Sequence, residues 1–187
     1  MIRAPHFLFA VMTLPRLAAA EGDAPPPSLA RALKAAAPEV QLAAAKPKPP
    51  AGSPSQPGRP QPTKIGEHRL LTAGQLAKGA WLKAGAGESS IWRLTVRSKG
   101  AAAMRLHFQN FHILAGKVWV HNGKDWFGPY TGDGMYGDGD FWSHVVPGER
   151  LTIEYEPPAG EAPKPLPFKV QSVSHLTLNP FDSAGAR

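Results

Sequence analysis

The chain has 187 residues, 21 prolines, no cysteine and a formal net charge of +7. Residues 1–20 contribute +2, residues 21–64 contribute +3 (six basic, three acidic) and residues 65–187 contribute +2 (thirteen basic, eleven acidic). Most of the positive charge thus lies outside the C-terminal part, which argues against the basic face that nucleic-acid binding requires. The lack of cysteine excludes disulfides, thiolate nucleophiles and Cys-type zinc sites.

The first 20 residues predict a secretory signal peptide. Arg3 precedes a short apolar run at 7–14, and the small residues Ala18–Ala20 favour cleavage after Ala20. This run is too short to cross a bilayer of about 30 Å as a permanent helix. We therefore expect an exported protein, periplasmic or extracellular, with no stable membrane span after signal cleavage.

Residues 21–64 predict a disordered linker rich in Pro and Ala. Eleven prolines fall in this stretch, and runs such as Pro25–Pro27 favour extended polyproline II over a packed core. Ser28 precedes the helix-forming run 29–37, so a short Ser-capped helix that ends before Pro38 is expected within the linker. The sequence favours a transient helix over a docking helix, since so short a helix is marginal alone.

Residues 65–180 predict one β-sandwich domain, followed by a tail at 181–187. Apolar residues recur with the two-residue period of half-buried strands, and Gly, Asn and Asp cluster between these segments. The segments are 91–98, 104–108, 117–121, 126–131, 141–146, 151–155 and 168–176. With no helical pattern between them, they indicate an all-β fold, an antiparallel two-sheet sandwich or jelly roll, with a closed small barrel as the alternative.

Two local features refine the prediction. Asn122 and Gly123 form the strongest short hairpin signal in the chain. The apolar spacing around Phe108 changes from two to three residues before Phe111, which predicts a bulge near Gln109 and Asn110 that returns Phe111 to the core side.

The sequence offers no catalytic constellation. Neither Gly-Xaa-Ser-Xaa-Gly nor Gly-Asp-Ser-Gly occurs, and the serines of the domain lie in turns or on alternating strands. The histidines lack the paired spacing of zinc sites, and His107 and His121 alternate with apolar residues, which predicts that they face outward; the four considered are His107, His112, His121 and His144.

Asp133, Asp138 and Asp140 are the candidate metal ligands. Three carboxylates lie within eight residues and are separated by glycines, which are the ingredients of a calcium site built from oxygen ligands. Their spacing fails the EF-hand rule, and Gly-Asp pairs are ordinary turn residues. A solvated loop and a calcium site both remain open, with the loop preferred; no other cofactor is predicted.

Aromatic residues offer a second binding hypothesis. Exposed rings can stack on the flat faces of sugars, although large aromatic residues usually belong to the core. The residues considered for such a platform are Trp126, Tyr130, Tyr136, Trp142 and Tyr155.

A series of motifs in residues 80–178 resembles a known family. The order of these motifs is similar to that in the non-catalytic β-sandwich preceding the protease domain of bacterial secreted trypsin-like serine proteases, including lysyl-endopeptidase-like enzymes. The matching segments are Trp92-Arg93-Leu94, Val96-Arg97-Ser98, Gly100-Ala101, Leu106-His107-Phe108, Phe111, Gly128-Pro129-Tyr130-Thr131-Gly132, Gly137-Asp138-Gly139-Asp140-Phe141-Trp142-Ser143, Val146-Pro147-Gly148-Glu149-Arg150, Ile153-Glu154-Tyr155 and Val173-Ser174-His175-Leu176.

The resemblance implies a protease-associated module without the protease. No catalytic triad residue can be transferred, because no position matches one, and we expect either a truncated protease gene product or a stand-alone accessory. Such a region could help a protease domain in trans to fold, inhibit it or target it to a surface. The alternative is an extracellular module that binds a glycan or other cell-surface ligand, or that depends on calcium.

Overall fold

The computed structural model describes residues 24–31, 33, 35–44, 64–83, 90–158 and 165–181. The predicted signal peptide, residues 45–63 of the predicted linker and residues 182–187 of the predicted tail lie outside these residues. No helix in the described ranges is long and apolar enough to cross a membrane.

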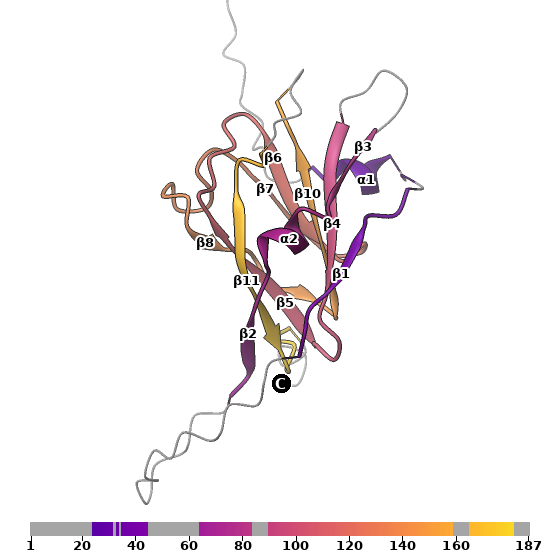
Figure 1. Ribbon diagram of the computed structural model, residues 1–187, viewed down its shortest axis with the longest axis vertical. Helices are drawn as coiled ribbons and strands as arrows, with labels where there is room; N and C mark the ends of the chain where they lie inside the picture. The colour runs from indigo at the N-terminus through magenta and orange to yellow at the C-terminus, as the bar shows by residue number, and fades with distance from the viewer. Residues whose placement is uncertain are drawn as a thin grey trace, which may run out of the picture.

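The described residues fold as an all-β sandwich of two sheets, as predicted (Figure 1). Two one-turn helices accompany the strands, α1 (Pro27–Ala30) and α2 (Ala73–Leu76). Sheet A contains β1 (Glu39–Gln41), β3 (Ala80–Lys83), β4 (Ser90–Arg97), β6 (Lys117–His121), β7 (Trp126–Tyr130) and β10 (Arg150–Glu156). Sheet B contains β2 (Gly66–Leu70), β5 (Ala103–Gln109), β8 (Phe141–Trp142), β9 (Val146–Pro147) and β11 (Lys169–Leu176).

Pairing within the sheets is antiparallel except at one edge. Sheet A has the order β1-β4-β10-β6-β7, and sheet B has the order β2-β11-β5-β8. The short strands β3 and β9 pair with β4 and β5. Only β1 pairs in parallel, with Val40 opposite Val96 of β4. The free edge of β4 is therefore covered by two short strands, which limits the unpaired backbone exposed there.

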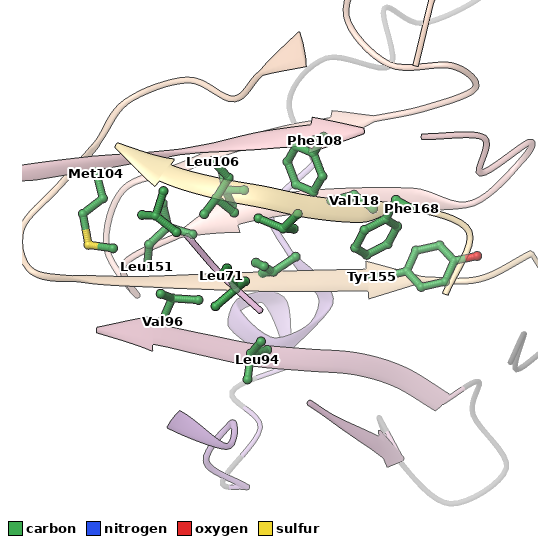
Figure 2. Packing of buried hydrophobic residues seen from close by; sticks show 14 of the residues in the cluster. Leu71, Leu94, Val96, Met104, Leu106, Phe108, Val118, Leu151, Tyr155 and Phe168 are labelled. Atoms are coloured by element: carbon green, nitrogen blue, oxygen red, sulfur yellow. The ribbon is translucent and has the colours of Figure 1, made fainter. Parts of the chain in front are cut away.

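The core lies between the two sheets. Alternation along each long strand sends one set of side chains inward, and Figure 2 shows them interleaved between the sheets. The labelled core residues in this figure are Leu71, Leu94, Val96, Met104, Leu106, Phe108, Val118, Leu151, Tyr155 and Phe168, all of them buried. Burial of these apolar side chains is the main stabilising contribution in a chain without disulfides.

The chain returns Phe111 to the core by a local backbone change. Strand β5 ends at Gln109, and Asn110 then adopts the left-handed conformation with φ 50°. Asn tolerates this region better than most residues. Phe111 is fully buried as predicted, although the register shift between β5 and β11 lies on the partner strand, between Val170 and Ser172 of β11.

The predicted hairpin at Asn122 and Gly123 is present between β6 and β7. The connection is longer than a two-residue turn, because residues 122–125 lie between the two strands. The Asn122 side-chain oxygen accepts hydrogen bonds from the backbone N–H groups of Lys124 and Asp125 within it. By contrast, the single strand predicted at 141–146 is divided into β8 and β9.

The prediction of a disordered linker is wrong for the first part of residues 21–64, which packs onto the sandwich. Val40 and Leu42 are buried members of the core, and β1 completes the edge of sheet A (Figure 1). The predicted Ser-capped helix is also different, since α1 spans one turn, begins at Pro27 and has no side-chain cap. Ser28 instead uses its backbone N–H to bind Glu154 of β10.

Candidate functional site

Side chains on the outer face of sheet B form a surface that we call the tryptophan platform, made of His68, Arg105, His107 and Trp142. Along β5, Arg105 and His107 alternate with the core residues Leu106 and Phe108, so they point away from the core. Trp142 of β8 pairs with His107, which places both side chains on that outer face.

The indole ring of Trp142 is the centre of the platform. It stacks on the His107 ring, with centroids 4.7 Å apart and planes inclined by 11°, and it meets the His68 ring at 4.9 Å. The Arg105 guanidinium carbon lies 4.6 Å from the centroid of the Trp142 ring, in cation–π contact. The platform therefore combines an aromatic surface, a fixed cation and titratable imidazoles.

Register explains how the ring of Trp142 can reach from β8 to β2. Ser174 of β11 lies between Arg105 and His68, and Ser172 lies opposite His107. Both serines face the same outer side, and their short side chains leave room above the sheet. Serines in these strands therefore have a structural role, which the sequence also indicated.

The three candidate metal ligands do not form one carboxylate cluster. Asp140 Oδ1 lies 2.5 Å from His107 Nε2, and Asp133 Oδ1 lies 2.7 Å from His112 Nδ1. Asp138 instead accepts a hydrogen bond from the backbone N–H of Asp140. Among the described residues, no group of three or more His, Cys, Asp or Glu side chains is arranged to hold a metal ion.

The environment of Asp140 favours its charged form. Hydrogen bonds from His107 and then Gln109 lower the pKa of this carboxyl below its ordinary value. The hydrogen bond between Asp140 and His107 also fixes the His107 imidazole beside Trp142. Asp140 is thus a positioning group of the platform.

The Gly/Asp loop, residues 132–140, is solvent-exposed at most of its positions but is hydrogen-bonded to the chain that follows β5. The backbone N–H of Phe111 donates to the carbonyl of Gly139, and that of Ile113 donates to the carbonyl of Gly132. Gly134 adopts φ +83°, and a Cβ there would lie 2.1 Å from the Phe141 ring. Glycine is required at this position by both backbone conformation and space.

An apolar groove lies beside the platform, near the C-terminal end of β11. It has a volume of about 350 Å³. Ile65 and Leu178 are 55% and 59% exposed there, and Arg105 joins the groove to the platform. Its lining residues are Ile65, Arg105, Val145, Leu176, Leu178, Asn179 and Pro180.

A second pocket, of about 330 Å³, contains Tyr130 and His144. The Tyr130 hydroxyl lies 2.9 Å from His144 Nδ1 and also accepts the backbone N–H of His144. Burial raises the pKa of Tyr130 to about 12, so the phenol stays protonated at neutral pH. The His144 ring stacks on Phe127, and these contacts make the pair a structural connection between β7 and the segment after β8.

A buried Ser–His contact also exists, at the edge of the sandwich. Ser98 Oγ lies 2.9 Å from His175 Nδ1, but Arg69 donates to the same oxygen. Glu67, the nearby acid, binds Arg69 rather than His175. Burial, followed by the charge of Arg69, lowers the pKa of His175, and Ser98 has no exposed surface. This arrangement lacks the accessible nucleophile and the acid-oriented base that acyl transfer needs.

The sequence did not reveal a polar cluster on the outer face of sheet A. Glu154 Oε2 lies 3.2 Å from Arg93 Nε and 3.5 Å from His121 Nε2, and all three side chains are buried. Their strands predict outward-facing positions, but the N-terminal part of the chain contacts this cluster, because the backbone N–H of Ser28 donates to Glu154 and Arg93 donates to the carbonyl of Ala35. His121 therefore lies on the predicted face, although it is not exposed to solvent as a surface histidine would be.

The other residues proposed for sugar stacking do not gather around Trp142. Tyr130 and Tyr155 are core residues, whereas Tyr136 is 72% exposed. Trp126 is half-buried at the start of β7. His68 and Arg105 complete the platform instead, and neither has a sequence signal beyond its place in a β-strand.

These observations define the class of protein: an all-β sandwich of two sheets, with no accessible serine nucleophile and acid-oriented base brought together among the described residues. A family model described as the lysyl endopeptidase N-terminal domain matches residues 34–177. The chain belongs to this family. Comparison with curated proteins and with solved structures gave no match.

Proposed function

We propose that this chain is an exported, non-catalytic pro-region or accessory domain that binds a trypsin-like serine protease domain and assists its folding or restrains its activity. The observation that carries this proposal is the family match, which extends from the segment before β1 to the end of β11. It covers almost the whole described sandwich. The tryptophan platform and the adjoining apolar groove also support the proposal, because their aromatic, cationic and aliphatic side chains suit binding.

The groove beside the platform is the proposed contact surface. It exposes aliphatic side chains next to an arginine, the combination of apolar centre and polar rim common in protein interfaces. It also lies where the chain leaves β11, and the family name places this domain N-terminal in lysyl endopeptidases. A catalytic domain that follows in those proteins would emerge beside this groove.

Refolding of a lysyl endopeptidase catalytic domain tests the proposal. The full chain should raise the yield of active protease or lower the activity of the folded enzyme, and the two proteins should co-elute. The double variant Ile65→Asp, Leu178→Asp should weaken both effects, since it places two charges in the groove. Leu114→Asp is the matched control, because Leu114 is 79% exposed and does not line the groove. Absence of both a complex and an effect would contradict the proposed function.

The platform favours a second candidate function, binding of a glycan. The Trp142 ring between two imidazoles and a guanidinium offers stacking and hydrogen bonding together. Titration of oligosaccharides into the full chain should then produce binding heat that Trp142→Ala abolishes. If Trp142→Ala instead impairs the effect on the protease and no sugar binds, the platform belongs to the protein interface.

A further inference from the structure

Side chains on the outer face of sheet A form hydrogen bonds with backbone groups of the segment 24–31. The indole N–H of Trp119 donates to the carbonyl of Ala24 at 3.0 Å. The backbone N–H of Ser28 donates to Glu154 Oε1 at 2.8 Å. Trp119 and Glu154 are register partners on β6 and β10, so the two anchoring side chains lie next to each other.

Three consecutive prolines, Pro25–Pro27, separate the two anchored backbone groups. Pro26 has φ −52° and ψ 140°, close to polyproline II geometry, and both Pro26 and Pro27 are buried. Proteins commonly recognise such segments with aromatic surfaces, because proline pre-sets the bound conformation and lowers the entropy lost on binding. An indole N–H that binds a carbonyl just before the prolines fits this mode of recognition.

The segment is packed differently from the core of the sandwich. No residue of 24–31 belongs to the core cluster, whereas Val40 and Leu42 of the following chain do. The family match begins at residue 34, after the segment. Segment 24–31 is therefore an addition placed on the surface of the family domain.

Several buried polar atoms beneath the segment also lack hydrogen-bond partners. Among the described residues, six buried side-chain polar atoms lack a hydrogen bond, and five of them are here: Ser28 Oγ, Arg93 Nε, both ring nitrogens of His121 and Glu154 Oε2. Arg93 Nε and His121 Nε2 still lie within ion-pair distance of Glu154 Oε2, whereas Ser28 Oγ and His121 Nδ1 have neither kind of contact. Buried polar groups without partners cost free energy that solvent would relieve. A segment that lies over buried polar atoms without hydrogen bonds can be displaced more easily than a core strand.

We propose that the outer face of sheet A, centred on Trp119 and Glu154, is a docking surface for a proline-rich peptide, and that residues 24–31 occupy it in cis. The ligand it accepts is a proline run that is extended up to its second proline and enters a helical turn at its third, with a free carbonyl before the run and a free backbone N–H after it. In the intact chain a competing peptide meets a surface already filled, because a tethered ligand has an effective concentration on the order of millimolar.

The test weakens the cis ligand and supplies the same sequence in trans. The full chain carries Pro25→Ser, Pro26→Ser and Pro27→Ser, and the probe is a fluorescent synthetic peptide with the sequence of residues 21–31. We expect saturable binding to this variant, seen by fluorescence anisotropy, and at least about tenfold weaker binding to the wild-type chain, whose cis segment competes. A probe with serine at its three proline positions should not bind.

The indole N–H signal of Trp119, assigned with Trp119→Phe, reports on the surface itself. This signal should move in the triple-serine variant and return toward its wild-type position when the peptide is added. In that background, Trp119→Phe and Glu154→Gln should each weaken the peptide about tenfold, the loss expected for one strong hydrogen bond. Glu67→Gln, on β2 of the other sheet, is the matched control and should leave binding unchanged.

Three results would overturn the proposal. The triple-serine variant could keep the wild-type indole signal, which would mean that the prolines do not hold the segment. The signal could move while no peptide binds, or the serine probe could bind as well as the proline probe. None of these readouts involves a protease, so failure here is distinguishable from failure of the proposed function.

Discussion

Glu154 is fully buried on the outer side of sheet A, and its neighbours determine its charge state. Burial by itself raises the pKa of a carboxyl group, but His121 and Ser28 beside Glu154 outweigh this and lower its pKa below 4.5. Ionised Glu154 therefore stabilises the fold, because it is bound by a backbone N–H and lies next to a guanidinium. Its replacement tests the size of that contribution.

We predict that Glu154→Gln lowers the free energy of unfolding by about 1.5–3 kcal/mol at pH 7, the range for a hydrogen bond to a charged group. Because the folded-state pKa is lowered, this contribution is complete above the ordinary pKa and is lost as the pH falls through the folded value. Urea unfolding of both proteins between pH 7 and pH 3 measures it. The difference between them should shrink below about pH 4.5; a constant difference would contradict the assignment.

Among the elements, β1 shows what sequence patterns could not predict. The long strands β4, β5, β6, β10 and β11 were predicted because each has enough residues for a two-residue period. Strand β1 has only three residues, Glu39–Gln41, in a proline-rich context, so local composition indicated a linker. Its position depends on pairing with β4, which is a long-range contact without a local signal.

The same limit applies to the candidate site. The outward direction of His107 follows from alternation along β5, but its contact with Trp142 depends on the register of β8. The spacing of Asp133 and Asp140 in the chain suggested a shared ligand, whereas their partners are histidines of other segments. Sequence patterns predict the face of a strand more readily than the neighbours across it.

We predict that Leu42→Ala lowers the free energy of unfolding by about 2–4 kcal/mol, as for other buried leucines. Leu42 is 3% exposed and belongs to the core cluster, so its truncation leaves a cavity. Gln41→Ala is the matched control, since Gln41 is the exposed neighbour and should change stability by less than about 0.5 kcal/mol. Equal effects of the two substitutions in urea unfolding would show that this segment is not part of the folded domain.

At the scale of the whole molecule, the two outer faces of the sandwich differ. Segment 24–31 lies on Trp119 and Glu154 of sheet A, whereas the Trp142 platform of sheet B has no described segment across it and continues into the apolar groove. The two proposals thus concern separate surfaces. The proposed protease contact uses the groove beside sheet B, and the proline-rich ligand uses sheet A.

The Asp–His hydrogen bonds at the loop end of the sandwich lead to a prediction about calcium. Each carboxylate of the Gly/Asp loop already has a separate partner, and a bound calcium ion would have to break the contacts of Asp133 with His112 and of Asp140 with His107. Ligands that bind only the folded state raise its melting temperature, so a calcium site would be visible in thermal unfolding. We expect millimolar calcium chloride to leave the Tm unchanged relative to the same concentration of magnesium chloride. A rise specific to calcium, lost in the variant Asp138→Ala, Asp140→Ala, would show instead that the loop rearranges around the ion and that carboxylates held apart at rest can converge.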